Sequence, residues 1–276
     1  MRLEPGALFT RHAARARDAG LDGLYLVLSF DCDRTEDAEV AIDVHDRLAK
    51  LGVRPVYAVP GELLQAGGET YARIAASGAE FLNHGGRKHT YFDEDLGRDA
   101  SCFFYDEVGA EAVAEDIEYG HRLVTEVVGT QPTGFRVPHF GTYQQRSQLR
   151  YLHERLGALG YEFSTSTVPS WGLREGPVFR RFGLAELPVS GMASSPLEIL
   201  DTWSCFEAPD RTRDPEDFLR EAELLAHGHA AAGPGLINIY GDPSHIADRP
   251  EFFEAIETIA AVAQPCGYRE ILELAR

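Results

Sequence analysis

The chain has 276 residues, with 26 Lys and Arg against 44 Asp and Glu, so its formal charge at neutral pH is −18. Apolar residues make up 44% of the sequence, which supplies a core and excludes a disordered chain. The negative charge repels phosphate groups, which argues against general nucleic-acid binding and against attraction to an anionic membrane. The length fits one large domain, and we expect residues 1–276 to form a single unit.

The cysteines and the start of the chain indicate a cytoplasmic protein. Cys32, Cys102, Cys205 and Cys266 are far apart and form no C-x-x-C pair, so we expect free thiols in a reducing compartment. The N-terminus has no apolar segment of signal-peptide length, and the longest apolar runs, such as residues 24–30, are too short to span a membrane. We therefore expect a cytoplasmic location without membrane insertion.

Short runs of β-branched and aromatic residues alternate with segments of helical period. Strands are predicted over residues 24–30, 54–59, 79–82, 134–137, 161–166, 182–189 and 236–240. Helices are predicted over residues 37–51, 62–65, 70–76, 109–128, 145–159, 215–232, 250–263 and 268–275. Residues 87–106 have no regular period and are expected to form a long functional loop, while residues 197–205 fit neither pattern. The alternation predicts an α/β fold with a parallel sheet, and about seven such units favour a barrel.

Two carboxylates follow the first predicted strand, in Ser29-Phe30-Asp31-Cys32-Asp33. Residues two apart on a strand point to the same face, so Asp31 and Asp33 should project together. Adjacent carboxylates repel each other unless a cation or a shared proton relieves them. The pair therefore indicates a metal site at the end of this strand, with a cap for the following helix as the alternative.

Two histidines mark the end of the third predicted strand. His84 ends the strand and His89 follows five residues later. Together with a carboxylate, two histidines can hold zinc or a similar divalent ion. Gly85 and Gly86 allow the turn between them, because glycine adopts positive φ freely. The alternative is a pair of surface or hydrogen-bonding histidines.

Charged and titratable residues also follow the fourth and the last predicted strands. Arg136 in such a position needs a carboxylate partner, for which Asp31 is the candidate, since an unpaired buried charge is costly. A purely structural ion pair is the alternative. His245, with Asp242 nearby, suits a general acid near neutral pH or a cap for the next helix. Because all these groups lie at the C-terminal ends of separate strands, we expect them to share one site.

The order of these motifs resembles the NodB-homology polysaccharide deacetylases, carbohydrate esterase family four. The motifs are Ser-Phe-Asp-x-Asp, Asn-His followed by His, Phe-Arg-x-Pro-x-x-Gly, and a late strand followed by His, and the resemblance spans residues 24–246. It implies a distorted (β/α)7-type TIM-like barrel. It also implies a divalent metal, Zn²⁺ or a similar ion such as Co²⁺, held by Asp33, His84 and His89.

The resemblance assigns the remaining motif residues to catalysis. Asp31 matches the catalytic base, Arg136 the arginine that holds this base, and His245 the general acid. The implied activity is a metal-dependent hydrolase that removes an acetyl or similar small acyl group from an amino-sugar derivative, with a water activated by the metal as nucleophile. A cyclic amide or imide hydrolase of the same fold, similar to allantoinases, is the first alternative, and a non-catalytic sugar-binding barrel is the second.

Three features depart from the better-known members of that family. The two Asp residues of the first motif are one residue apart instead of adjacent, which resembles the branch with allantoinase-like amidohydrolases. The histidines are five residues apart instead of four, which implies a bulge before His89. Residues 163–167 contain no carboxylate to orient the acid histidine, so Asp201 or Asp242 is expected to do so.

The expected partner is a small-molecule or carrier-linked amino-sugar substrate. An acidic surface has no general attraction for polyanionic chains, and a cytoplasmic enzyme does not meet cell-wall polymer. No nucleic-acid partner is expected. A homo-oligomer is compatible with the sequence.

Overall fold

The structure is a computed structural model that describes residues 5–275. The main sheet consists of β1 (Leu24–Asp31), β2 (Val56–Val59), β3 (Phe81–Asn83), β6 (Gly134–Phe135), β7 (Phe163–Ser164), β8 (Phe179–Arg181), β9 (Leu184–Glu186), β10 (Gly235–Gly241) and β11 (Gln264–Pro265). A separate antiparallel hairpin is formed by β4 (Thr90–Asp93) and β5 (Arg98–Ser101).

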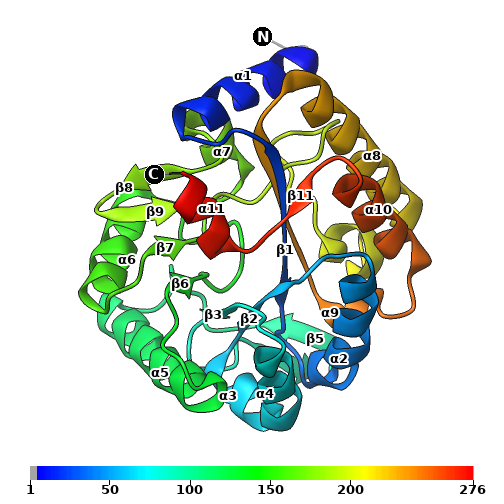
Figure 1. The fold of residues 1–276 in the computed structure, drawn as a ribbon. Helices are drawn as coiled ribbons and strands as arrows, with labels where there is room; N and C mark the ends of the chain where they lie inside the picture. Colours follow the sequence, from blue (N-terminus) through cyan, green and yellow to red (C-terminus); the bar gives the residue numbers. More distant parts are fainter. Residues whose placement is uncertain (1–4, 276) are drawn as a thin grey trace.

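Most of the helices lie around the outside of this sheet, whereas the C-terminal helix lies across one end of it (Figure 1). The helices are α1 (Pro5–Asp18), α2 (Thr35–Lys50), α3 (Gly61–Ala66), α4 (Gly68–Ala76), α5 (Ala110–Val128), α6 (Arg146–Ala158), α7 (Pro169–Glu175), α8 (Pro215–Ala232), α9 (Pro243–Ile246), α10 (Pro250–Ala260) and, at the C-terminus, α11 (Tyr268–Leu274). A π-helical turn spans Trp203–Glu207.

The main sheet has the strand order β10-β1-β2-β3-β6-β7-β9-β8, with β11 paired to the start of β1. All of these pairs are parallel except β8 with β9. The sheet curls into a distorted barrel, which confirms the predicted fold class. The C-terminal ends of its strands meet at one rim, where parallel β/α folds place their ligands.

The barrel is closed between β9 and β10 by an irregular segment, residues 187–190, instead of a regular strand ladder. Asn238 of β10 donates from its side-chain amide to the carbonyls of Leu187 and Pro188, at 3.1 and 3.0 Å. Ser190 donates its backbone N–H to the carbonyl of Asn238 at 2.8 Å, and its hydroxyl accepts from the Asn238 N–H at 2.9 Å. We call these contacts the seam.

The sequence of β1 explains which of its side chains enter the barrel. Leu26, Leu28 and Phe30 pack into the large cluster shared with the surrounding helices, whereas Tyr25 and Val27 belong to the cluster inside the sheet. A strand buried on both faces reads as a nearly continuous apolar run, as this one does. Alternation then carries residues 29 and 31 to the interior side and residue 32 to the helical side.

The structure corrects two of the predicted segments. Residues 87–106 are not a plain loop, because they contain the β4–β5 hairpin. The predicted strand over residues 182–189 is present but shorter, as β9, because the chain reverses at Phe182 and Gly183, whose φ values are 52° and 86°, between β8 and β9. Helices α1, α7 and α9 were not predicted. Helices α7 and α9 span only 7 and 4 residues, which is too few to show a helical stripe.

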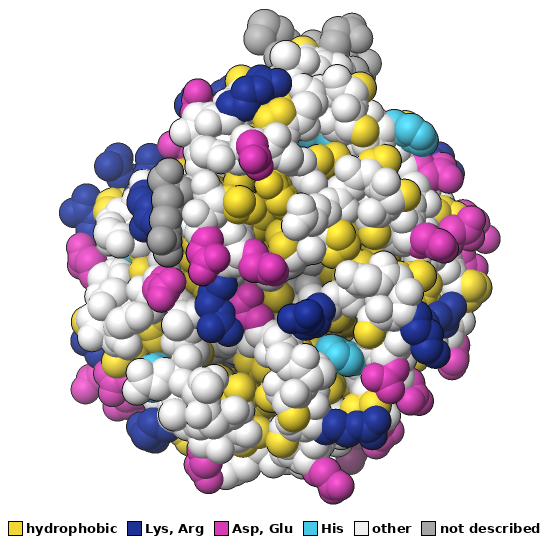
Figure 2. All heavy atoms as spheres, in the orientation of Figure 1, with side chains coloured by type: hydrophobic (Ala, Val, Ile, Leu, Met, Phe, Trp, Pro, Cys, Tyr) yellow, Lys and Arg dark blue, Asp and Glu magenta, His cyan; other side chains and the backbone are white. Residues whose placement is uncertain are grey.

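Acidic and basic side chains are interspersed over the face shown in Figure 2. The four cysteines are all free thiols, and three of them are buried. Within residues 5–275, none of the helices combines the length and hydrophobicity needed to cross a lipid bilayer.

Candidate active site

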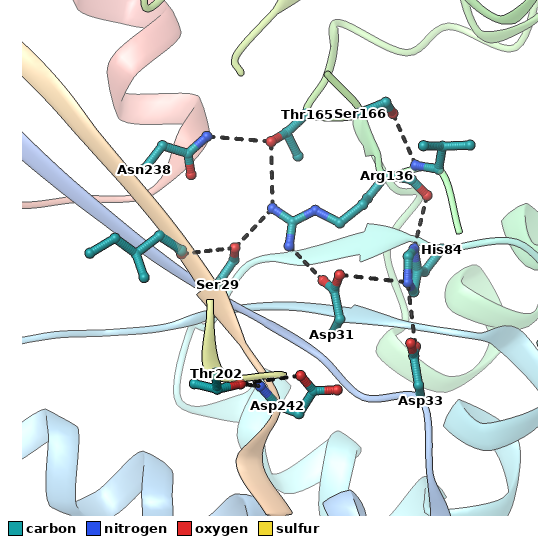
Figure 3. Close-up of polar contacts among 12 residues, drawn as sticks. Ser29, Asp31, Asp33, His84, Arg136, Thr165, Ser166, Thr202, Asn238 and Asp242 are labelled. Carbon is teal, nitrogen blue, oxygen red and sulfur yellow. Dashed lines mark hydrogen bonds and ion pairs between the residues drawn. The ribbon is translucent and has the colours of Figure 1, made fainter. Parts of the chain in front are cut away.

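The residues predicted at the strand ends meet at one rim of the barrel. Asp33 follows β1, and His84 follows β3 (Figure 3). One side-chain donor atom each from Asp33, His84 and His89 lies within 4.8 Å of the others. The Nε2 atom of His89 is 2.8 Å from Oδ1 of Asp33, and the Nε2 atom of His84 is 3.4 Å from the same oxygen. Three separate predictions thus converge on one cluster.

The ring of His84 is oriented by the backbone of the neighbouring strand end. Its Nδ1 donates to the carbonyl oxygen of Arg136 at 2.9 Å, because a carbonyl can only accept. Nδ1 therefore carries a proton, and Nε2 is the ring nitrogen that faces Asp33. A backbone carbonyl bound to the second ring nitrogen is the usual support of a metal-binding histidine.

The five-residue spacing between the histidines is accommodated by a bulge around Gly85. Its φ of 80° lies in the left-handed region, and a Cβ there would collide with the carboxylate of Asp116. That buried carboxylate accepts the backbone N–H of Arg87 at 2.9 Å and the hydroxyl of Tyr105 at 2.7 Å. Asp116, on α5, therefore fixes the loop that carries His89.

The donor set fits a divalent cation. His84 and His89 are almost fully buried, and Nε2 of His84 has no hydrogen-bond partner among residues 5–275. Burial raises the pKa of Asp33, but the two histidines outweigh it and hold this pKa well below its ordinary value. One carboxylate and two imidazoles are a common ligand set for Zn²⁺ that leaves coordination positions open. Asp33 is not the cap of helix α2, because the N-cap residue is Arg34.

Asp31 projects into the barrel beside this cluster and pairs with Arg136. The guanidinium Nη1 donates to Oδ1 of Asp31 at 2.5 Å, and Oδ2 lies 3.9 Å from Nε2 of His84. Arg136 is fully buried, and Asp31 is only 5% exposed. Burial raises the pKa of Asp31, and the positive charge of Arg136 opposes that rise. The pKa of Asp31 stays above its ordinary value, and a carboxylate with a raised pKa is suited to accept a proton.

His245 lies in α9, directly after β10, and its ring is held from the Nδ1 side. Nδ1 is 3.1 Å from the hydroxyl of Thr202 and 3.2 Å from Oδ2 of Asp242. Burial lowers the pKa of His245, but the nearby charge of Asp242 outweighs it and raises this pKa above its ordinary value. Asp201 instead accepts the Ser204 N–H at 2.6 Å. Of the two carboxylates proposed to orient this histidine, Asp242 is thus the one in contact.

A cavity of about 300 Å³ connects these groups. It is lined by Asp31, Asp33 and His245, and its opposite wall comes from the β4–β5 hairpin. Nε2 of His245 has no hydrogen-bond partner in the described part of the chain, so it is available to a molecule in the cavity. The ring of Trp203 lies 6.0 Å from that of His245 and also lines this cavity.

Two residues at the cavity were not predicted. His139 has a φ of 60° and donates from Nε2 to the carbonyl of Cys102 at 2.9 Å, so it holds the chain that leaves the hairpin. Burial lowers the pKa of His139 to about 4, so its ring is neutral. Its position three residues after Arg136, just after a predicted strand, could have indicated that it lies at the same rim. The contact of Thr202 with His245 could not be predicted from the sequence, because the two residues are 43 positions apart.

No family model matches this sequence, and no curated protein matches it. Solved structures do match. A candidate polysaccharide deacetylase from Mycobacterium smegmatis is 18% identical, with a TM-score of 0.65 over 92% of this chain and 91% of that one. The Puue allantoinase is 12% identical, with a TM-score of 0.61 over 91% and 89% of the two chains.

A pseudoenzyme of carbohydrate esterase family four from Bacillus anthracis is 12% identical, with a TM-score of 0.55 over 91% of this chain and 66% of that one. These likenesses span nearly the whole chain and include proteins described as deacetylase, allantoinase and pseudoenzyme. The chain therefore has the fold of the polysaccharide deacetylases of carbohydrate esterase family four, the fold that its sequence motifs predict.

Proposed function

We propose that this protein is a metal-dependent amide hydrolase that removes an acetyl or similar small acyl group from an amino-sugar derivative. The observation that carries the proposal is the arrangement around one cavity. A buried Asp-His-His donor set lies beside an Asp–Arg pair, and a histidine with a free ring nitrogen lines the same cavity. Amide hydrolysis needs these three parts: an electrophile, a base and an acid.

Asp33, His84 and His89 would hold the divalent ion, most simply Zn²⁺. When bound, such an ion lowers the pKa of water and polarises a carbonyl oxygen. Asp31 accepts the proton of the attacking water at the carboxylate that Arg136 aligns. As the C–N bond breaks, Nε2 of His245 donates a proton to the departing amine, and the acyl group leaves as a carboxylate.

The hairpin offers a contact for the part of the substrate that does not react. Thr90 donates its hydroxyl to the carbonyl of Asp33, and Asp99 pairs with Arg34 at 3.1 Å, so this face of the hairpin is turned toward the strand end of β1. Phe92 is opposite Asp99 in the hairpin register, hence on the same face, and it is 62% exposed. Phe92 does not line the cavity itself, and we propose that it contacts the part of the substrate that extends past Thr90 and Asp99, where it can stack on a ring.

A ring amide, as in allantoinases, is the second candidate substrate. The Asp-x-Asp spacing and the structural likeness to an allantoinase support it. The non-catalytic alternative has the likeness to a pseudoenzyme in its favour. Against it, every charged group that hydrolysis requires is present at the cavity and in hydrogen-bond or ion-pair contact.

The decisive experiment is a metal analysis of the purified protein followed by a substrate panel. We expect about one Zn²⁺ or Co²⁺ per chain and release of acetate from N-acetylglucosamine or a nucleotide-linked N-acetyl sugar. Ring opening of allantoin without acetate release would favour the second candidate. A protein that binds no added Zn²⁺ or Co²⁺ and hydrolyses neither class is not an amide hydrolase of this kind.

Two aspartate variants separate the two parts of the site. Asp33→Ala should lose the metal and the activity together, because it removes a ligand atom. Asp31→Asn should keep the metal and lose turnover by about 10²–10⁴-fold, the usual contribution of a general base. Equal metal loss in both variants would contradict the separate roles that we assign to these aspartates.

A further inference from the structure

The side chain of Tyr268, in the C-terminal helix, extends into the barrel from the end opposite the cavity. Tyr268 is the first residue of α11, which follows β11 at the start of β1. Its backbone N–H donates to Oε2 of Glu80 at 3.0 Å, and its ring packs on Phe163 with 5.4 Å between centroids. The side chain is fully buried. These two contacts fix the position of its hydroxyl in the middle of the barrel.

This hydroxyl contacts the guanidinium of Arg136. Nη2 of Arg136 donates to the Tyr268 hydroxyl at 2.7 Å and to the Ser29 hydroxyl at 2.8 Å, while Nη1 donates to Asp31. Among residues 5–275, Asp31 is the sole carboxylate in ion-pair distance of this buried cation. The two hydroxyls therefore fix the side of the guanidinium that faces away from Asp31.

The direction of each hydrogen bond follows from the seam. The amide nitrogen of Asn238 donates to the Leu187 and Pro188 carbonyls, so its Oδ1 faces Tyr268 at 2.8 Å. The single proton of the Tyr268 hydroxyl goes to this oxygen, and its lone pairs remain for Arg136. A continuous chain of hydrogen bonds thus runs from the seam to Asp31. Figure 3 shows Asn238, Arg136 and Asp31, with a second and longer link from Asn238 to Arg136 through the hydroxyl of Thr165, at 3.4 Å on each side.

We propose that Tyr268 is a positioning residue for the base: it acts through Arg136 to hold Asp31 in place. This inference rests on the proposed function and deepens it, because it extends the machinery of the base to the C-terminal helix. Removal of the hydroxyl takes away the donor to the Asn238 Oδ1 and the shortest contact of the Arg136 Nη2, which keeps the Ser29 hydroxyl at 2.8 Å and the more distant Thr165 hydroxyl at 3.4 Å. The guanidinium then shifts, and the Asp31 carboxylate moves with it.

The test compares Tyr268→Phe with Tyr57→Phe in the zinc-loaded full-length protein. Tyr57 is a matched control, because it is equally buried and its hydroxyl is 3.1 Å from Nδ1 of His45, outside the network of Arg136. We expect Tyr268→Phe to lower kcat about tenfold with KM and zinc content unchanged, since one lost buried hydrogen bond is worth about that factor. Tyr57→Phe should keep kcat.

A crystal structure of each variant gives a readout that does not depend on activity. In Tyr268→Phe, we expect the Asp31 carboxylate to be displaced relative to the wild type, and in Tyr57→Phe to be unmoved. An unmoved Asp31 in Tyr268→Phe overturns the inference even if the protein hydrolyses no substrate in the panel. Conversely, a displaced Asp31 in an inactive protein supports the inference and contradicts the proposed function alone.

Discussion

The two sides of the cavity are supported in different ways. On the base side, Asp31 and Arg136 are held by side chains from inside the barrel, which come from distant strands and from the C-terminal helix. On the acid side, His245 is held by Asp242, three residues before it, and by a single hydroxyl from the segment before the π-helical turn. The base is thus held from within the barrel, whereas the acid is held at the rim, in the short helix α9.

This difference predicts how substitutions divide between stability and rate. A change on the base side disturbs fully buried charges and should cost both stability and turnover. A change on the acid side leaves the barrel intact and should affect turnover and its pH dependence.

The largest effect is expected for Arg136→Met. It leaves Asp31 as an uncompensated buried charge, so we expect a loss of about 3–5 kcal/mol in the free energy of unfolding, measured by denaturant titration. Arg155→Met is the control, because Arg155 pairs with Glu118 at 2.7 Å on the half-exposed surface. The control should lose no more than about 1 kcal/mol. Equal losses in the two variants would show that Asp31 does not depend on its partner.

The next effect is expected for His245→Gln. Without the acid, kcat should fall by about 10²–10⁴-fold, while bound zinc stays at the wild-type level. Single-turnover kinetics with an N-acetyl sugar measure this loss. A variant with more than one tenth of the wild-type kcat would exclude His245 as the general acid.

Asp242→Asn should have a smaller effect with a defined direction. The histidine must be protonated to donate, and the charge of Asp242 raises the pKa of His245 against the effect of burial. Removing that charge lowers this pKa, so the alkaline limb of the kcat profile should move to lower pH. Asp248→Asn, an exposed change in the same loop, should leave the profile where it is. If the alkaline limb of the kcat profile is unshifted in both variants, Asp242 does not raise the pKa of His245.

The smallest effect is expected at the hairpin. Phe92→Ala should raise KM for di-N-acetylchitobiose a few-fold, since one stacking contact is worth about 0.5–1.5 kcal/mol. It should leave kcat and KM for N-acetylglucosamine unchanged. Tyr91 is half-exposed on the opposite face of the hairpin, so Tyr91→Ala is the control and should change neither substrate. Equal KM changes in both variants would remove Phe92 from the substrate contacts.

The sequence predicted the barrel and the strand-end residues because both depend on short-range patterns. An apolar run followed at once by Asp31 places that residue on a strand end whatever the rest of the chain does. Asp242 was readable for the same reason, since it is three residues from His245. Thr202 and Tyr268 were not, because their partners lie more than 40 and more than 130 residues away.

The β4–β5 hairpin was missed for a different physical reason. Strand recognition relies on alternation between a buried and an exposed face, and both faces of β4 are largely exposed. With no core to pack against, Thr90–Asp93 carries no apolar pattern. The hairpin is set instead by its own ladder and by the contacts of Thr90 and Asp99 with the end of β1.

The seam has a consequence for the protein's fluctuations. A barrel closed by a few side-chain and loop hydrogen bonds has its weakest joint there, so transient local opening and amide exchange should begin at residues 187–190. Asn238 closes this joint and also directs the hydroxyl of Tyr268. Each opening event therefore loosens the acceptor that orients the Tyr268 hydroxyl, so local opening of the barrel is expected to be coupled to the position of Arg136 and of Asp31.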